Sequence, residues 1–313
     1  MRILHISDTH LSGTHPVFYL NWRLFAARIR ALQPDLVIHT GDAAISDPDR
    51  VDDIAFARAE MDKLGLRYVI VPGNHDIGDN PVPADWLHHE PKYCTDARRD
   101  AWISQFGPDF WVEDIAGYRF IGLNAQVFGT GLSAEDAQWD MLRQALKDGG
   151  QIVLLSHKPL YSQVDGSDLP LTSIPPEASQ EIEALCADAD VLLHLSGHLH
   201  RHKIIDRAGF HRVWGASTAF VCSHEKMARR NGRIEVGMQS ITLGLKSHLY
   251  QCWRPSTWIF APGWTRTAAA SARSCPALRQ LPWRPTPRGA FEDFGPRRVN
   301  LECLMVDLQN ARI

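Results

Sequence analysis

Residues of the types that bind metal ions follow the ends of several apolar runs in this chain. Asp8 and His10 come directly after one such run, and Asp42 comes two residues after another. Oxygen and imidazole ligands of this kind suit Mn²⁺, Fe²⁺, Co²⁺ and Zn²⁺. Five blocks of this type occur, in the order Asp8-Thr-His10, Gly41-Asp42, Gly73-Asn74-His75-Asp76, His157 and Gly197-His198-Leu-His200. Together they predict a metal centre.

Each block alone has an ordinary structural explanation. Asp8-Thr-His10 and Gly41-Asp42 are also typical of turns, and His157 fits a buried histidine at a strand end. His198 and His200 are a stronger signal, because residues two apart in an extended chain point the same way. No cysteine takes part, which favours an open catalytic site over a structural zinc site. One bridging carboxylate would hold two ions roughly 3.5–4 Å apart, as in two-metal hydrolases.

The elements that must position these residues are short strands alternating with helices, a pattern typical of α/β proteins. Apolar residues three and four apart predict helices over 18–32 and 51–64, and further helices are expected over 133–147, with Ser133 as N-cap, and 177–187. Strands are expected over residues 2–7, 35–40, 67–71, 118–124, 151–156 and 190–196. Ligands bind beyond the carboxyl ends of strands in open α/β sheets, so the five blocks are expected at one edge.

The second half of the chain predicts further strands and two long loops. Residues 203–206 and 211–214 favour two short strands around an Ala-Gly turn, and 233–245 predicts one or two more. The long irregular segments 77–96 and 160–176 are expected to form a rim around the site, because long loops in compact domains tend to be functional.

The five blocks resemble the pattern of the calcineurin-like metallophosphoesterases: D-x-H, G-D, G-N-H-[DE], H and G-H-x-H. All five stand in that order, and the resemblance covers about residues 1–220. It implies an α/β fold, a four-layer α/β/β/α sandwich of two mixed β-sheets flanked by helices, with the metals at one end. The compact spacing and the opening Ile-Ser-Asp-Thr-His are most similar to bacterial class III cyclic-nucleotide phosphodiesterases and related glycerophosphodiesterases.

The resemblance also implies a role for each block. Two divalent ions are expected, Mn²⁺ or Fe²⁺ foremost, with Zn²⁺ or Co²⁺ as alternatives. His75 would approach the phosphate as general acid or charge stabiliser without binding metal, with Asn74 beside it as a substrate contact, and Asp76 would orient His75 or its loop. The first ion would be held by Asp8, His10, Asp42 and His200, and the second by Asp42 as the bridge with Asn74, His157 and His198.

The resulting functional hypothesis is a metal-dependent phosphodiesterase. It would hydrolyse a small diester, such as a cyclic nucleotide or a glycerophosphodiester, with a metal-bound hydroxide at a binuclear site. A phosphomonoesterase or a nucleotide-sugar or lipid pyrophosphatase shares the same ligand set. From another class, a non-catalytic metal-binding scaffold would be expected to lack a ligand or His75, and all are present.

At the fourth block the chain departs from the His-His-Pro-Pro of many relatives. It has His157-Lys158-Pro159-Leu160, which keeps the expected ligand. Lys158 either places a cation near the site, favouring a more anionic substrate, or faces solvent.

Charge divides the chain into two regions. Residues 251–313 contain nine Arg, no Lys and four acids, a net of +5, which leaves −8 of the overall −3 for residues 1–250. We expect a metallophosphoesterase domain over 1–250. The Arg-, Pro- and Trp-rich arm 251–313 is either a dimerisation or capping segment or the product of a shifted reading frame.

Hydropathy and charge argue against two classes of partner, membranes and nucleic acids. No apolar run approaches the roughly 18 residues that cross a bilayer, so we expect no membrane partner and a cytoplasmic location. The acidic residues 1–250 show no basic stripe, which makes nucleic acid an unlikely partner. A small phosphodiester substrate and a homodimer or higher homo-oligomer are the expected partners. The six cysteines form no C-x-x-C pair and are expected to be free thiols.

Overall fold

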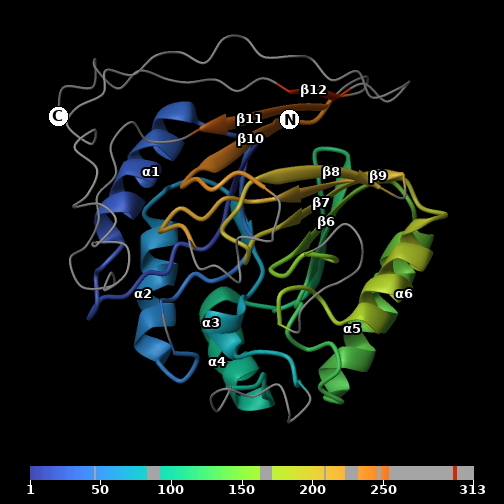
Figure 1. Cartoon of the computed structure of the whole chain (residues 1–313), viewed down its shortest axis with the longest axis horizontal. Helices are drawn as coiled ribbons and strands as arrows, with labels where there is room; N and C mark the ends of the chain where they lie inside the picture. Colours follow the sequence, from blue (N-terminus) through green and yellow to red (C-terminus); the bar gives the residue numbers. More distant parts are fainter. Residues whose placement is uncertain are drawn as a thin grey trace, which may run out of the picture.

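The computed structural model of the chain contains two mixed β-sheets with helices on both outer faces (Figure 1). It describes residues 1–45, 47–82, 92–162, 171–207, 209–222, 232–244, 248–253 and 299–301. This is the four-layer α/β/β/α arrangement that the sequence predicts.

The first sheet carries the early blocks. Its strand order is β12-β11-β10-β1-β2-β3, and β1, β2 and β3 run parallel, so their carboxyl ends meet at one edge. β10 pairs antiparallel with β1. The strands are β1 (Arg2–Ile6), β2 (Leu36–His39), β3 (Tyr68–Ile70), β10 (Met238–Thr242), β11 (His248–Trp253) and β12 (Val299–Leu301).

The second sheet carries the late blocks. Its order is β4-β5-β6-β7-β9-β8, with β5, β6, β7 and β9 parallel and the edge strands β4 and β8 antiparallel. The strands are β4 (Trp111–Ile115), β5 (Tyr118–Leu123), β6 (Gln151–Ser156), β7 (Val191–Ser196), β8 (Lys203–Arg207) and β9 (Phe210–Trp214).

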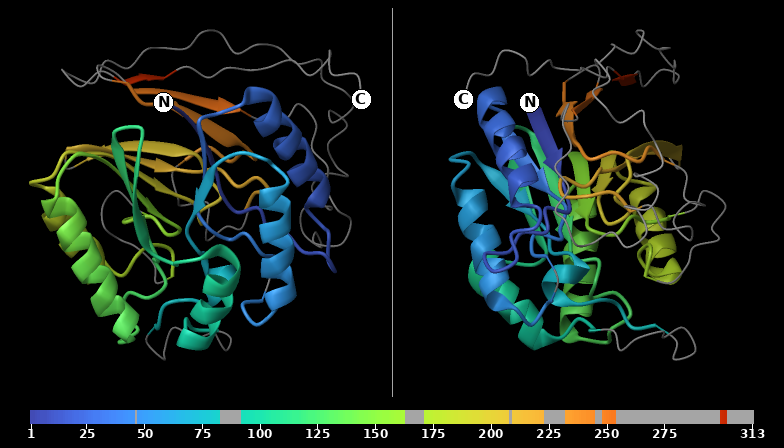
Figure 2. Two further views of the ribbon diagram at one scale, coloured as in Figure 1. Left: turned by 180° about the vertical axis from the view of Figure 1, so that it is seen from behind. Right: turned by 60° about the vertical axis from the view of Figure 1, so that its left-hand side comes forward.

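The helices cover the two outer faces. α1 and α2 lie on one side of the molecule, α5 and α6 on the other, and the views in Figure 2 agree. α3 and α4 lie near one end. Their bounds are α1 (Tyr19–Leu32), α2 (Val51–Asp62), α3 (Asn74–Ile77), α4 (Asp96–Phe106), α5 (Ser133–Lys147) and α6 (Pro176–Cys186).

Three apolar clusters hold the four layers together, and the two-residue period of the strands separates them. In β1, Ile3 packs between the sheets, whereas Leu4 and Ile6 pack under α1 and α2. In β6, Val153 faces the other sheet and Leu154 faces the outer helices. β1 and β6 thereby bury both faces, which explains why their sequences are nearly continuous apolar runs.

Most predicted elements agree with the structure within one or two residues, but α3, α4, β4, β11 and β12 were not predicted. The apolar residues of α4 and β4 show little periodicity. One capping residue also differs. Ser133 is not an N-cap: it is the first residue of α5, and Leu132 precedes it without a side-chain cap. Glu135 instead accepts hydrogen bonds from the N–H groups of Gly129 and Gly131, fixing the turn before the helix.

Parts of both expected rim loops and most of the C-terminal arm lie outside the described residues. Segments 83–91 and 163–170 belong to the two loops, and 254–298 and 302–313 to the arm. The division of the chain at residue 250 therefore stays a prediction. Among the described residues, no helix is long and apolar enough to cross a bilayer. The described cysteines Cys94, Cys186 and Cys222 are free thiols, as expected.

Two histidines inside strands, His5 in β1 and His194 in β7, are buried and hydrogen-bonded to hydroxyl groups. His5 Nε2 lies 2.9 Å from Thr40 Oγ1, and His194 Nε2 lies 2.7 Å from Ser156 Oγ. Burial, with help from the charge of Arg212, lowers the pKa of His194 to about 3. The ring is therefore neutral in the folded protein near pH 7.

We predict that His194 makes the fold acid-sensitive. The unfolded chain binds a proton here below pH 6.5, whereas the folded chain does not until about pH 3. The free energy of unfolding therefore decreases as the pH is lowered through this window, by about 1.4 kcal/mol per pH unit for one proton. Urea unfolding of metal-free protein from pH 8 to pH 5 should show a shallower fall for His194→Gln than for wild type. His15→Gln, at an exposed position, is the control, and equal slopes in all three proteins would refute the assignment.

Candidate metal centre

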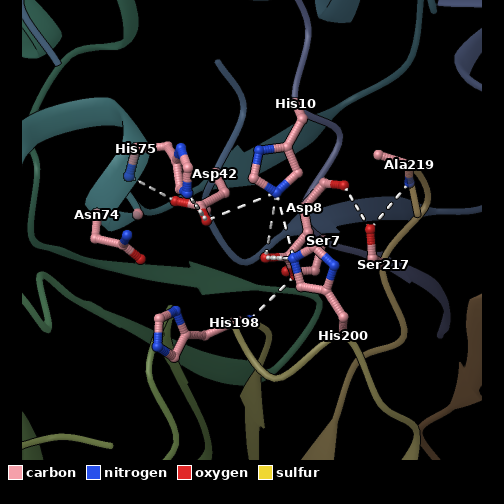
Figure 3. Close-up of polar contacts among 12 residues, drawn as sticks. Ser7, Asp8, His10, Asp42, Asn74, His75, His198, His200, Ser217 and Ala219 are labelled. Carbon is pink, nitrogen blue, oxygen red and sulfur yellow. Dashed lines mark hydrogen bonds and ion pairs between the residues drawn. The ribbon is translucent and has the colours of Figure 1, made fainter. Parts of the chain in front are cut away.

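The seven residues expected to bind metal lie at the facing carboxyl ends of the two sheets. Asp8 and His10 follow β1, Asp42 follows β2, and Asn74 opens α3 after β3. His157 follows β6, and the pair His198 and His200 follows β7. Main-chain bonds join neighbouring strand ends: Asp8 N–H donates to Gly41 O at 3.0 Å, and Gly197 N–H donates to His157 O at 2.9 Å. The two sheets meet where His198 N–H donates to Asp8 Oδ2 at 3.1 Å (Figure 3).

The main chain is strained at these positions. In the described residues, eight residues other than glycine have a positive φ, and five of them are expected ligands. Each such conformation costs roughly 1–3 kcal/mol and persists where its surroundings impose it, most often at functional sites. The five, with φ between 46° and 65°, are Asp8, His10, Asp42, His198 and His200.

Side-chain atoms of these residues form two adjoining groups. In the first, His200 Nε2 lies 3.2 Å from Asp8 Oδ1 and 3.3 Å from His10 Nε2. In the second, His157 Nε2 lies 3.3 Å from Asp42 Oδ2 and 3.1 Å from His198 Nδ1. Asp42 Oδ2 is also 3.8 Å from His10 Nε2, so its carboxylate lies between the two groups.

Asn74 completes the second group, with Oδ1 3.1 Å from His157 Nε2. The structure thus brings all seven predicted ligands together. It also places each in the group that the sequence resemblance implies for it.

Each of the four histidines turns its other ring nitrogen toward a main-chain carbonyl. A carbonyl oxygen only accepts, so in the neutral ring the facing nitrogen carries the proton and the nitrogen in the cluster presents a lone pair. The four pairs are His10 Nδ1 with Ile45 O at 3.4 Å, His157 Nδ1 with Thr40 O at 2.7 Å, His198 Nε2 with Leu171 O at 2.7 Å and His200 Nδ1 with Phe220 O at 3.0 Å. Such carbonyl partners commonly orient histidines that bind metal.

This arrangement fits divalent cations. The lone pairs of the four histidines face one another and the oxygens of Asp8, Asp42 and Asn74, with distances of 3.1–4.0 Å between them. Asp8 Oδ1 is buried and has no hydrogen-bond partner. Buried acceptors without donors are costly, and a cation bound among them removes that cost. Groups of potential ligand atoms within 4.8 Å of one another include Asp8-His10-His200 and Asp42-His157-His198.

The pKa values of two histidines in the metal-free chain also show that the site favours positive charge. Burial disfavours charge on His157, yet Asp42 and Asp8 outweigh it and raise its pKa to about 9. Burial likewise opposes charge on His200, and Asp8 raises its pKa well above the usual value. Metal ions compete with these protons for the same nitrogens, as expected of a site whose ligands must be deprotonated to bind.

His75 and Asp76 differ from the ligands in exposure and contacts. The His75 side chain is 37% exposed, and its Nε2 lies 4.0 Å from Asp42 Oδ2, close enough to form a third group with His10 and Asp42. Asp76 is buried, and its carboxylate accepts hydrogen bonds from Gly73, Ala43 and Ala44 N–H. Of the two roles expected for Asp76, orienting the loop is the one these contacts support. Burial and the charge of Asp42 raise its pKa to about 7.

Facing solvent was one of the two alternatives expected for Lys158 from the sequence, and the structure excludes it. Its side chain is 0% exposed, and Nζ donates to Asp79 Oδ1 and Asn80 Oδ1. The physical reason is its place at the end of a buried strand, where the Asp79 carboxylate offers a partner for the charge.

Sequence reasoning did not find the residues that surround the ligands. The carbonyls of Thr40, Leu171 and Phe220 carry no signal in the sequence, since every residue has one. Phe18 and Phe220, which stack with ring centroids 4.8 Å apart, also escaped prediction. The Phe220 ring lies 4.4 Å from that of His200 and 5.0 Å from that of His10.

Glycines allow the strand ends to approach closely enough to form the site. A Cβ on Gly73 would lie 2.1 Å from Asp42 Oδ1. A Cβ on Gly197 would lie 1.8 Å from Ser7 Oγ and 2.6 Å from Asp8 Oδ2. Gly197 is therefore required where the two sheets touch.

We predict that Gly197→Ala weakens metal binding, because the new methyl group displaces Asp8 or separates the sheets. Overpacking of this kind costs about 1–3 kcal/mol of stability. Mn²⁺ titration calorimetry should show at least one ion bound more weakly than in wild type. Ser7→Ala in the same chain removes the closest clashing atom and should restore part of the affinity. Unchanged affinity in Gly197→Ala would contradict the close approach.

Comparison with known proteins agrees with this geometry. The profile of the family described as calcineurin-like phosphoesterase matches residues 1–202. A probable glycerophosphodiester phosphodiesterase GpdQ from Arcobacter nitrofigilis is 24% identical over 213 residues, which is 64% of this chain and 72% of that protein. The bovine serine/threonine-protein phosphatase CPPED1 is 27% identical over 186 residues, 54% of each chain, so the match spans about half of its length.

Solved structures share the fold at low identity. A dimetal phosphatase from Danio rerio superposes with a TM-score of 0.52 at 13% identity, covering 80% of this chain and 95% of that one. Purple acid phosphatase PPD1 from yellow lupin superposes with a TM-score of 0.54 at 15% identity, covering 78% and 49%. From the profile match over most of its length, the chain belongs to the calcineurin-like phosphoesterase family.

Proposed function

We propose that this protein is a metal-dependent phosphodiesterase that hydrolyses a small phosphodiester at a binuclear centre. The observation that carries the proposal is the pair of ligand groups with Asp42 between them. Two ions in such a site supply Lewis-acid chemistry, by activating water and neutralising charge on the phosphoryl oxygens. Asp8, His10, Asp42 and His200 would hold one, and Asp42, Asn74, His157 and His198 the other. The mixed oxygen and imidazole donors suit Mn²⁺ or Fe²⁺, with Zn²⁺ and Co²⁺ also compatible.

The surroundings of the centre support a diester over a monoester. A monoester dianion carries one more negative charge than a diester, and the nearby cation Lys158 is already paired with Asp79. A diester also carries a second organic group, which needs a surface to lie on. The half-buried rings of Phe18 and Phe220 supply an apolar surface beside His10 and His200. The similarity to a probable glycerophosphodiesterase points the same way.

His75 is the residue we assign to proton transfer. Its side chain is 37% exposed, whereas the side chains of Asp8, Asp42, His10, His157 and His200 are at most 5% exposed. Its Nδ1 has no hydrogen-bond partner, and its main-chain N–H donates to Asp42 Oδ1 at 2.9 Å. Asp42 thereby positions the loop that presents His75. Asp76 holds the same loop through three main-chain N–H groups, so we assign it a positioning role.

A phosphomonoesterase is the alternative, supported by the similarity to a serine/threonine-protein phosphatase. The ligand set is the same for both activities, so substrate comparison decides between them. The cytoplasmic location and the homo-oligomer expected from the sequence stay predictions.

We predict that metal-loaded protein hydrolyses bis(p-nitrophenyl) phosphate faster than p-nitrophenyl phosphate, and that EDTA abolishes both reactions. Assays with Mn²⁺, Fe²⁺, Co²⁺ and Zn²⁺ in turn identify the effective metal. A preference for the monoester would overturn the diesterase proposal. No rate above the EDTA control with any metal would overturn the enzymatic one.

Two variants separate metal binding from proton transfer. Asp42→Asn should lose metal and turnover together, because it lies between both ligand groups. His75→Ala should keep both ions while kcat falls by a factor on the order of 10²–10⁴, the usual value of a general acid. Metal content and kcat are measured on the same samples, with His15→Ala as the exposed-histidine control. Equal metal loss in both variants would refute these roles.

Phe18 tests whether the aromatic surface receives the second ester group. Bis(p-nitrophenyl) phosphate and methyl p-nitrophenyl phosphate share a leaving group and differ only in the group retained. Phe18→Ala should raise KM for the first roughly 2–10-fold, the value of one aromatic contact, and leave that for the second nearly unchanged. Phe18→Leu, which keeps an apolar side chain, should show a smaller effect. Equal changes for both substrates would exclude this contact.

A further inference from the structure

Among the lysines and arginines that form ion pairs in the described part of the chain, Lys158 is the most deeply buried. Its side chain is 0% exposed and ranks among the largest fully buried side chains. Nζ donates to Asp79 Oδ1 at 2.5 Å and to Asn80 Oδ1 at 2.6 Å. A buried ammonium group is costly unless it is paired and hydrogen-bonded, so the pairing fixes where this side chain can lie.

The two ends of this contact belong to different sheets. Lys158 directly follows the predicted ligand His157 at the end of β6 in the second sheet. Asp79 and Asn80 follow α3, which begins with the predicted ligand Asn74 and continues from β3 in the first sheet. The ion pair therefore joins the two chain segments that bring His157 Nε2 and Asn74 Oδ1 to 3.1 Å.

Both ends are anchored by further hydrogen bonds. Asn80 Nδ2 donates to Ala125 O at 2.8 Å and to Phe128 O at 2.9 Å. The main chain of Asp79 donates to Lys92 O and accepts from Cys94 N–H. At the other end, Ser156 Oγ donates to Lys158 O at 2.6 Å. Because both segments are fixed, the Lys158 side chain between them fixes the distance from one segment to the other.

We propose that Lys158 is a positioning residue whose ion pair with Asp79 sets the spacing of the metal subsite formed by Asp42, Asn74, His157 and His198. The inference rests on the proposed binuclear function and assigns Lys158 no contact with substrate. It predicts an effect confined to one half of the centre. The other half, formed by Asp8, His10 and His200 with the shared Asp42, is carried by the ends of β1, β2 and β7, whereas Lys158 follows β6.

The test is metal titration of Lys158→Met, which keeps the apolar stem and removes the charge. Co²⁺ is added to EDTA-stripped protein and followed by visible absorption and by calorimetry. Wild type should bind two equivalents. In Lys158→Met one of them should bind 10–100-fold more weakly, the usual effect of losing a residue that orients a metal ligand, while the other is unchanged. His157→Ala shows which equivalent belongs to this subsite.

Three further measurements make the result decisive. Lys63→Met removes an exposed lysine that pairs with Glu60, and it should change neither equivalent. Asp79→Asn leaves the lysine in place and should weaken the same equivalent, so it serves as the test where Lys158→Met does not fold. Turnover of Lys158→Met should recover as the metal concentration rises, which a general loss of folded protein would not do.

The outcomes separate the two proposals. Suppose that wild type binds two equivalents of metal. If Lys158→Met and Asp79→Asn bind both of them as tightly as wild type, or both equally more weakly, the positioning role is overturned and the binuclear function stays intact. Fewer than two equivalents in wild type would overturn the binuclear function and the positioning role with it.

Discussion

The convergence of lone pairs at the carboxyl ends of two sheets is the constraint on which the rest of this structure depends. Four imidazole nitrogens and the oxygens of Asp8, Asp42 and Asn74 face one another in a buried space, with no proton donor among them once the histidines are neutral. Such an arrangement is unfavourable without cations. A chain that folds this way has a site that selects positive charge, whether protons or divalent ions.

The surrounding fold opposes the collapse or separation of this cluster. Five of its residues adopt left-handed main-chain conformations, and Gly73 and Gly197 allow the strand ends to approach. The histidines are oriented by carbonyl groups of connecting segments, those of Thr40 and Ile45 after β2, Leu171 before α6 and Phe220 after β9. Apolar clusters on both faces of each sheet hold the layers, and Lys158 adds a polar connection between them. Rigidity at the centre is thus a property of the whole sandwich.

In the proposed function, the same geometry separates metal binding from proton transfer and substrate contact. Five of the seven proposed ligands are buried and Asn74 and His198 are half-buried, whereas the side chain of His75, in α3, is 37% exposed. The half-buried rings of Phe18 and Phe220 lie beside the centre, on the side of His10 and His200. An active site needs this division, because groups that hold metal must stay fixed, while groups that meet substrate must be reached from solvent.

The sequence by itself determined most of the strands that carry the site and the identity of the seven clustered residues, and its resemblance to a known family implied the layers. Apolar periodicity depends on local geometry, and a polar block such as Gly197-His198-Leu-His200 after a strand end is visible in one dimension. α4, β4 and the true start of α5 were not predictable, because their residues are set by neighbours distant in the chain. Only the tertiary structure decided the distances between ligands, the carbonyl that orients each histidine, and the burial of Lys158 against Asp79. These depend on how two sheets meet, and contacts between residues 79 positions apart leave no local pattern in the sequence.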